Sequence, residues 1–272
     1  MARLPLWRTA LVLWGVAHSA WAAGPPVDRR NFVACPIIRD TKTVPCWLSE
    51  YKGELYYLGV QVDFGSEFWP PYLGHKVLVE GQVSDEPRIC GGVVLKPIKI
   101  SPLPEADENC RTMLPAEDRY TIPFATRGPG PNNRPSRNGL PGATPAPVAP
   151  TAPTQAAAPS GPREFVVLYS FNNRIWNVRA TPPMQQARDY ALATHAKRVE
   201  VVAYRGASLL SDGSVYVEDE GVAEMRARQV GEILQQVGLP AAAMSVRWDD
   251  APQKPNGVDD PLRRKTVIRV IP

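Results

Sequence analysis

The chain has 272 residues with a formal net charge of +4, and 44% of its residues are hydrophobic, a share that is ordinary for a folded protein. Nucleic-acid-binding domains usually carry a clustered basic patch, which so weak a charge does not indicate, so no nucleic-acid partner is expected. The 30 prolines are about twice the usual share and indicate at least one segment without a core.

The first residues have the pattern of a secretory signal peptide. Arg3 and Arg8 flank the start of an apolar run over residues 9–16, and Ala20-Trp21-Ala22 offers small residues for cleavage after Ala22. The run is shorter than the roughly 20 apolar residues that a membrane-spanning helix needs. The sequence therefore predicts that residues 1–22 are removed on export, which lowers the formal charge to about +2.

All four cysteines lie before residue 111, and they are Cys35, Cys46, Cys90 and Cys110. An even number of cysteines in an exported chain predicts two disulfides. Three connectivities are possible, and we favour the nearest neighbours, Cys35 with Cys46 and Cys90 with Cys110. No C-x-x-C pair is present, so neither a zinc site nor another cofactor is expected. Charged residues at 28–30 separate Cys35 from the apolar run, which argues against a lipid anchor there.

Residues 31–120 have the pattern of an N-terminal all-β domain, either a small barrel or a sandwich. The segments 53–64, 75–85 and 91–101 alternate apolar and polar residues between glycines and prolines. The succession of strand, turn and strand is similar to that of an OB-type barrel, a fold that often binds oligonucleotides or sugars. The aromatic side chains could form a stacking surface, but a core role is the simpler interpretation. They include Trp47, Tyr56, Tyr57, Trp69 and Tyr72.

Residues 127–162 form a linker rich in proline, alanine and glycine. Aromatic residues and apolar β-branched residues are nearly absent from it, so it cannot bury enough surface to offset the entropy lost on ordering. The composition predicts a disordered, semi-extended tether between two folded regions.

Residues 164–272 alternate strand and helix patterns in the order β-α-β-α-β-β. This order predicts a C-terminal α+β sandwich, in which two helices cover one sheet. The predicted strands are 164–171, 197–204, 243–248 and 265–271, and the predicted helices are 182–196 and 219–237.

The second helix places a charge on its apolar face. Val230, Ile233, Leu234 and Val237 form a stripe at helical spacing, and Arg226 lies one turn earlier on the same stripe. A buried guanidinium without an anion costs several kcal/mol, so a partner is required. The partner is either a bound carboxylate or an internal acid, and the sequence leaves both open. The internal candidates are Asp219, Asp249, Asp250, Asp259 and Asp260.

This helix resembles the R-A-x-x-V-x-x-x-L signature of the OmpA-like (OmpA C-terminal) peptidoglycan-binding domain family. The matching residues are Arg226, Ala227, Val230, Leu234 and Gly238, together with the basic pair Arg263 and Arg264 before the last strand. The resemblance covers about residues 164–272. It implies a periplasmic envelope protein, with outer-membrane association left open, whose Arg226 binds a stem-peptide carboxylate of diaminopimelate-containing peptidoglycan.

The chain departs from the family where the ammonium group of diaminopimelate is bound. The family has a G-H-T-D-like turn whose aspartate binds that group, whereas this chain has AYRGAS, with Gly206 at the position of the acid. Asp212 could reach the site from the following segment, and Asp219 corresponds to a family asparagine. The candidate peptidoglycan-binding residues are therefore Arg226, Asp219, Asp212 and Gly206. Arg263 and Arg264 are expected to be solvated charges at a strand end.

Two hypotheses for function remain. In the first, the C-terminal domain binds peptidoglycan and tethers the N-terminal β domain, which works at a distance from the wall and contacts other envelope proteins. In the second, Arg226 is paired internally and the protein is a scaffold that acts through protein–protein contacts, which Gly206 in place of an acid favours. No enzyme is predicted, because the chain has no G-x-S-x-G, H-E-x-x-H or P-loop motif, and His75 and His195 are more simply surface residues.

Overall fold

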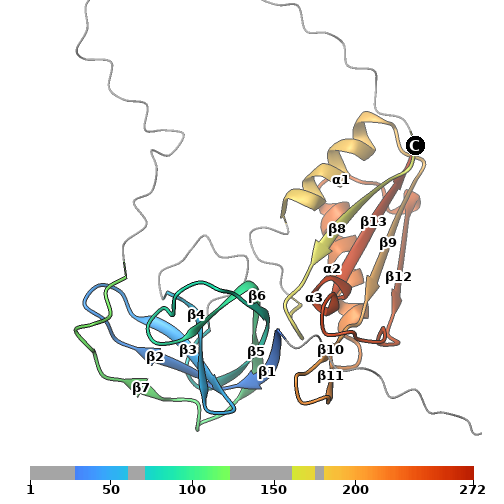
Figure 1. Ribbon diagram of the computed structural model, residues 1–272. Helices are drawn as coiled ribbons and strands as arrows, with labels where there is room; N and C mark the ends of the chain where they lie inside the picture. Colours follow the sequence, from blue (N-terminus) through green and yellow to red (C-terminus); the bar gives the residue numbers. More distant parts are fainter. Residues whose placement is uncertain (1–27, 61–70, 123–160, 175–180) are drawn as a thin grey trace, which may run out of the picture.

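The computed structural model describes residues 28–60, 71–122, 161–174 and 181–272 (Figure 1). The predicted signal peptide, Trp69 and most of the predicted linker lie outside these residues. We call residues 28–122 the β part and residues 161–272 the α+β part.

Within the described residues of the β part, every helix-or-strand element is a strand, and the strands form one sheet in the order β1-β5-β6-β4-β3-β2-β7. The 14-residue β6 pairs antiparallel with β5 and, at its other end, parallel with β4. The sheet thereby curls around its core (Figure 1). The strands are β1 (Arg29–Ala34), β2 (Pro36–Arg39), β3 (Cys46–Tyr51), β4 (Glu54–Val60), β5 (His75–Val83), β6 (Val93–Ala106) and β7 (Met113–Leu114).

The aromatic residues of the β part divide between core and surface. Trp47 and Tyr56 are buried, and Phe32 stacks on Tyr51 with ring centroids 4.8 Å apart. Tyr72 is 46% exposed, and its ring meets His75 edge-on. The core interpretation therefore holds for Trp47 and Tyr56, and these side chains do not form a stacking surface.

All four cysteines are paired, but the expected connectivity is wrong. The disulfides join Cys35 to Cys110 and Cys46 to Cys90. In the β2–β3 hairpin, Arg39 lies opposite Cys46 and Pro36 lies opposite Ser49. Cys35 is therefore about four residues, or roughly 13 Å, along the strands from Cys46. That separation exceeds the reach of a disulfide, so sequence neighbours pair with distant partners instead.

The connectivity can be checked directly, because trypsin places each cysteine on its own peptide. The four peptides cover residues 31–39, 43–52, 89–99 and 100–111. Mass spectrometry of the unreduced digest should find peptide 31–39 linked to 100–111 and peptide 43–52 linked to 89–99. A link between 31–39 and 43–52 would contradict this arrangement.

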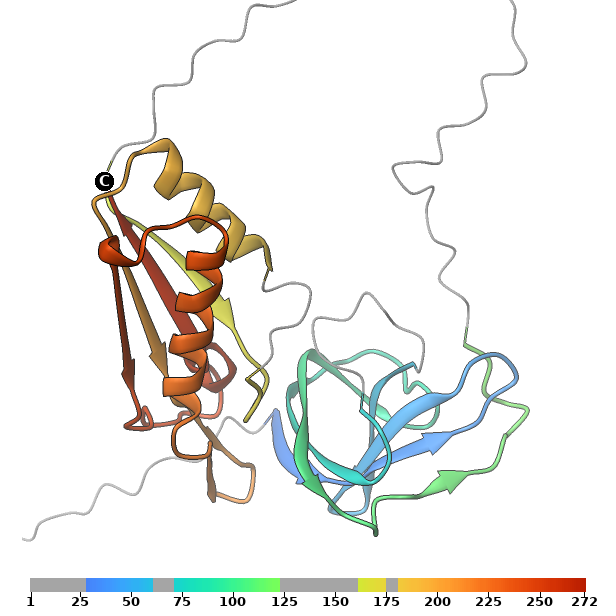
Figure 2. The same cartoon turned by 180° about the vertical axis from the view of Figure 1, so that it is seen from behind.

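The α+β part contains a four-stranded sheet in the order β12-β9-β13-β8, with β12 parallel to β9. The two long helices α1 and α2 pack on the same face of this sheet (Figure 2). A short hairpin and a four-residue helix are added to the predicted elements. The elements are β8 (Arg163–Leu168), α1 (Thr181–Ala193), β9 (Arg198–Tyr204), β10 (Ala207–Leu209), β11 (Val215–Val217), α2 (Val222–Gln236), a 3-10 turn (Ala241–Ala243), β12 (Met244–Asp249), α3 (Asp260–Arg263) and β13 (Lys265–Ile271).

Helix α2 begins three residues later than predicted. Gly221 precedes it with φ of 77°, a left-handed conformation that glycine adopts without steric cost. Asp219 and Glu218 therefore lie in the turn before the helix. Of the predicted stripe, Val230 and Leu234 are fully buried and Ile233 is partly buried, whereas Val237 lies just after the helix and is 41% exposed, so its predicted place on the buried face is wrong. Among the described residues, no helix has both the length and the apolar character needed to cross a membrane.

The β part and the α+β part are in direct contact. The backbone N–H of Asn31 donates to Ser211 Oγ (2.9 Å), and its carbonyl accepts from Ser211 N (2.7 Å). Asn31 Nδ2 donates to the carbonyls of Leu209 (3.0 Å) and Gly257 (2.8 Å). An apolar cluster spans both parts and includes Leu78, Leu103 and Phe171. The two parts thus pack together, which differs from the expected arrangement of domains that act at a distance.

Candidate functional site

The guanidinium of Arg226 is fully buried against an internal acid. Its Nη2 lies 2.6 Å from Glu218 Oε1, and its Nη1 lies 2.9 Å from Glu218 Oε2. Both side chains have zero exposure. This two-pronged geometry is the strong form of the arginine–carboxylate pair. Of the two roles left open by the sequence, the internal ion pair is the one observed, and Glu218 was not among the predicted partners.

The remaining donors of Arg226 are also occupied. Nε donates to the carbonyl of Asn173 (3.0 Å), Nη2 to that of Ser170 (3.3 Å) and Nη1 to that of Tyr204 (3.4 Å). The guanidinium carbon lies 4.5 Å from the ring centroid of Tyr169. Since a guanidinium has five N–H groups in a fixed fork, the fold itself satisfies the side chain.

Glu218 is held from three sides. Besides Arg226, it accepts hydrogen bonds from the backbone N–H of Asn172 (2.9 Å) and of Gly206 (2.7 Å). Burial would raise the pKa of Glu218, but the hydrogen bonds and charge of Arg226, with the charge of Arg264, outweigh it, so the pKa is lowered from 4.5. The carboxylate therefore stays ionised in the folded protein at neutral pH.

Gly206, the residue in place of the family acid, faces a second buried arginine. A Cβ atom at this position would lie 2.5 Å from Arg264 Cγ and 3.3 Å from Glu218 Oε2. No side chain, aspartate included, fits there without moving Arg264. Instead, the carboxylate of Glu218, which follows β11, accepts a hydrogen bond from the backbone N–H of Gly206, which precedes β10.

Arg264 is fully buried, which corrects the expectation of a solvated strand-end charge. Its guanidinium pairs with both carboxylate oxygens of Glu80, on β5 of the β part, and donates to Ser208 Oγ at 2.9 Å. Burial would lower the pKa of Arg264, but the charge and hydrogen bonds of Glu80 raise it. Arg263 is only partly buried and donates to the carbonyl of Lys254.

The other predicted site residues do not join this cluster as ligands. Asp212 is exposed, and its carboxylate accepts from Ser214 N (2.9 Å) and Ser214 Oγ (2.6 Å). Asp219 is also exposed, and its backbone N–H donates to Asn172 Oδ1 (2.8 Å). Three hollows lie within the described part of the chain, and neither Arg226 nor Glu218 lines any of these three.

Two acids that complete the cluster were missed by the sequence analysis. Glu80 ends an unbroken apolar run, Val77-Leu78-Val79, in the middle of a predicted strand. A charge in such a run signals a buried partner, because buried charges are paired. Glu218 follows the short run Val215-Tyr216-Val217, which is a weaker indication that the acid is buried with a partner. Asp260 is buried too, and it accepts from the backbone N–H groups of Leu209, Asn256 and Gly257.

The α+β part therefore has a layer of strands and a layer of helices, and Arg226 near the start of α2 is paired with Glu218 of the same chain. No protein-family model matches the chain. No curated protein matches it either.

Three of the solved structures that are similar to this chain each match about two fifths of it. They are the OmpA-like domain of FopA1 from Francisella tularensis (11% identity, 40% of this chain, 71% of that chain, TM-score 0.31), a putative MotB-like protein from Desulfovibrio vulgaris (13%, 41%, 76%, 0.33) and the cell wall anchor of the T6SS from Pseudomonas aeruginosa (14%, 41%, 82%, 0.31). These values are too low to carry an argument about this chain's ligand.

Removing Arg226 should be costly, because it leaves Glu218 buried without a counter-charge. We expect Arg226→Ala to lower the free energy of unfolding by about 3–5 kcal/mol in urea denaturation. Arg228 offers a matched control on the same helix, since it is exposed and pairs with Glu224 one turn away. Arg228→Ala should change stability by less than about 1 kcal/mol. Equal effects of the two substitutions would show that the Arg226 pair is not structural.

The lowered pKa of Glu218 predicts a loss of stability in acid. A carboxylate whose pKa is lower in the folded state stabilises the protein above its unfolded value, here 4.5, and that contribution is lost as the pH falls through the folded pKa. The gap in unfolding free energy between wild type and Glu218→Gln should therefore be largest at pH 7 and shrink below pH 4.5. Denaturation at several pH values from 7 to 3 measures this gap. A gap independent of pH would contradict the assignment.

Proposed function

We propose that this chain is a non-catalytic scaffold of the bacterial cell envelope that acts through contacts with other proteins and does not bind a peptidoglycan stem peptide at Arg226. One observation carries the proposal, namely the fully buried, two-pronged pair of Arg226 with Glu218. The place that the family resemblance gives to a ligand carboxylate is occupied by a carboxylate of the chain.

A stem peptide would have to displace Glu218 to reach Arg226. Displacement would break the two hydrogen bonds of the Arg226 fork and free the backbone N–H groups of Asn172 and Gly206. Each buried polar group left without a partner costs about 1–3 kcal/mol, and more for charged groups. A ligand that offers one carboxylate replaces part of these interactions and cannot compete with a tethered one.

Export and envelope location rest on the sequence. The signal-peptide pattern at residues 1–22 and the cysteines suit an oxidising compartment such as the periplasm. The direct contact between the β part and the α+β part supports a single composite body rather than a wall anchor with a distant second domain. A composite body offers one continuous surface to protein partners.

Co-sedimentation with purified peptidoglycan sacculi tests the proposal. The chain without residues 1–22 should stay in the supernatant, whereas a known peptidoglycan-binding domain in the same assay should pellet. A wild-type chain that pellets, together with a folded Arg226→Lys variant that does not, would overturn the proposal. Arg228→Ala serves as the control, because it changes a charge on the same helix outside the buried cluster.

A further inference from the structure

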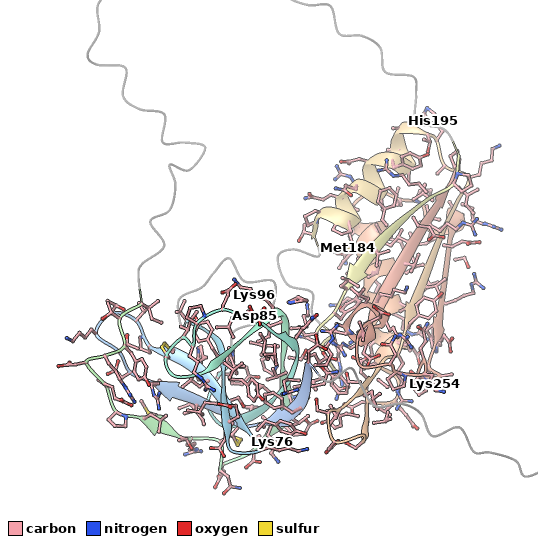
Figure 3. All side chains as sticks on the ribbon, viewed as in Figure 1. Lys76, Asp85, Lys96, Met184, His195 and Lys254 are labelled. Carbon is pink, nitrogen blue, oxygen red and sulfur yellow. A yellow bond between two sulfur atoms is a disulfide. The ribbon has the colours of Figure 1, made fainter. Side chains whose placement is uncertain are left out.

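A groove of about 440 Å³ lies between the β part and the α+β part. Its apolar lining comes from both parts, with Val33 and Leu103 on one side and Leu210 and Tyr216 on the other. Tyr216 stacks on the buried Phe171 with ring centroids 4.7 Å apart, so this wall is anchored in the core. The volume falls within the range of binding pockets, which often lie between domains. Lys76, labelled in Figure 3, marks the edge of the groove on the β part.

The hairpin beside the groove has one occupied edge and one open edge. On β10, Leu209 donates its N–H to Asp260 Oδ2 (2.8 Å) and its carbonyl accepts from Asn31 (3.0 Å). Tyr216 of β11 lies opposite Ser208 of β10. Glu218 N donates to Gly206 O (3.1 Å) and Leu210 N donates to Ser214 O (2.8 Å), so the backbone groups of Tyr216, which lies between these two bonded pairs, point toward β10.

The backbone groups of Val215 and Val217 consequently point away from β10. Among the described residues, they have no hydrogen-bond partner. Their side chains are 50% and 37% exposed. An unpaired edge with exposed valines is a template for pairing with another strand, and this chain does not cover it within the described ranges.

Among its charged lining residues, Lys76, Glu105 and Asp107, the groove has one acid without an ion-pair partner in the described ranges. Asp107 is paired with Lys76 at 3.1 Å, whereas Glu105 is exposed and has no ion-pair partner within residues 28–60, 71–122, 161–174 and 181–272. Glu105 and Tyr216 line the same groove, and burial together with the negative charges of Glu105 and Asp219 raises the pKa of Tyr216. A cationic side chain therefore complements Glu105.

We propose that an extended segment of another protein, rich in apolar and basic residues, docks in this groove by adding a strand to β11. Main-chain hydrogen bonds to Val215 and Val217 supply the pairing, as in other cases of strand addition. Apolar side chains on one face cover the exposed valines. Lysine or arginine stems on the other face lie on the apolar lining, and their charged ends reach Glu105.

Strand addition also suits the hairpin itself. A two-stranded hairpin is marginal alone, and a third strand adds both hydrogen bonds and an apolar face. This inference rests on the proposed scaffold function, because it names the class of partner that the scaffold binds.

The test uses the peptide acetyl-Lys-Val-Lys-Val-Lys-Val-Lys-amide as the probe, with the matched Glu-Val peptide as its control. Amide hydrogen exchange, followed by NMR on the chain without residues 1–22, should slow at Val215 and Val217 when the basic peptide is added. Calorimetry should show weaker or no binding of the acidic peptide. Slowing elsewhere only, or equal binding of both peptides, would overturn the proposal.

Two variant pairs locate the interaction. Val217→Pro removes an outward N–H while keeping the bonds between β10 and β11, since proline is tolerated at such edge positions, and it should abolish binding of the basic peptide. Val217→Thr keeps the N–H and should bind. Glu105→Lys should weaken binding about tenfold through the lost charge pairing, whereas Glu108→Lys, an exposed acid outside the groove lining, should not. Binding unchanged by Val217→Pro would exclude strand addition.

Co-sedimentation with sacculi and binding of the basic peptide test the two proposals separately. Sacculi that pellet the wild-type chain but not the folded Arg226→Lys variant would contradict the scaffold function whatever the peptide does. A chain that neither pellets nor binds the basic peptide would keep the scaffold function and remove this groove as its docking surface.

Discussion

The buried ion pair between Arg226 and Glu218 is the constraint on which the site depends. A fully buried guanidinium is costly unless its charge is paired and its N–H groups are hydrogen-bonded, and Arg226 meets both conditions. Here the anion comes from the turn before α2, and the carbonyls come from the chain after β8 and from the end of β9. The pair therefore fixes how these three segments meet, and it removes the positive charge that a foreign anion would need.

The second pair, Arg264 with Glu80, places another buried ion pair between the two parts, although Nε of Arg264 has no hydrogen-bond partner among the described residues. Arg264 precedes β13, and Glu80 lies on β5 of the other part, so the contact between the parts contains a buried, hydrogen-bonded charge pair. Such a pair specifies one arrangement of the parts, because any slip would leave a buried charge unmatched. It also explains Gly206, since a Cβ atom there would collide with the stem of Arg264. The departure from the family signature is thus tied to the contact between the two parts.

The sequence predicts the local structure of the α+β part well, because its helices and strands follow apolar periodicity. It also predicts that Arg226 needs an anion. It did not identify Glu218. The turn of the β10–β11 hairpin can be recognised from Asp212-Gly213, where Gly213 has φ of 88°, but a turn alone does not show that Glu218 reaches Arg226. Disulfide connectivity fails for the same reason: Cys35 and Cys46 are close in sequence but lie at opposite ends of a hairpin. Contacts between distant segments are set by register and packing, which spacing alone does not encode.

Glu218 directly follows β11, so the ion pair and the open strand edge share one segment. A strand that pairs with Val215 and Val217 would restrict the hairpin, and the same restriction holds the carboxylate of Glu218 against Arg226. If strand pairing at β11 strengthens the ion pair, linkage requires the ion pair to strengthen strand pairing by the same factor. Opening the arginine to a ligand would conversely require the turn between β11 and α2 to move, which would disturb the edge. Binding a small anion at Arg226 and presenting the proposed strand edge would therefore place opposite demands on this region, and the observed pair of Arg226 with Glu218 is compatible with the second.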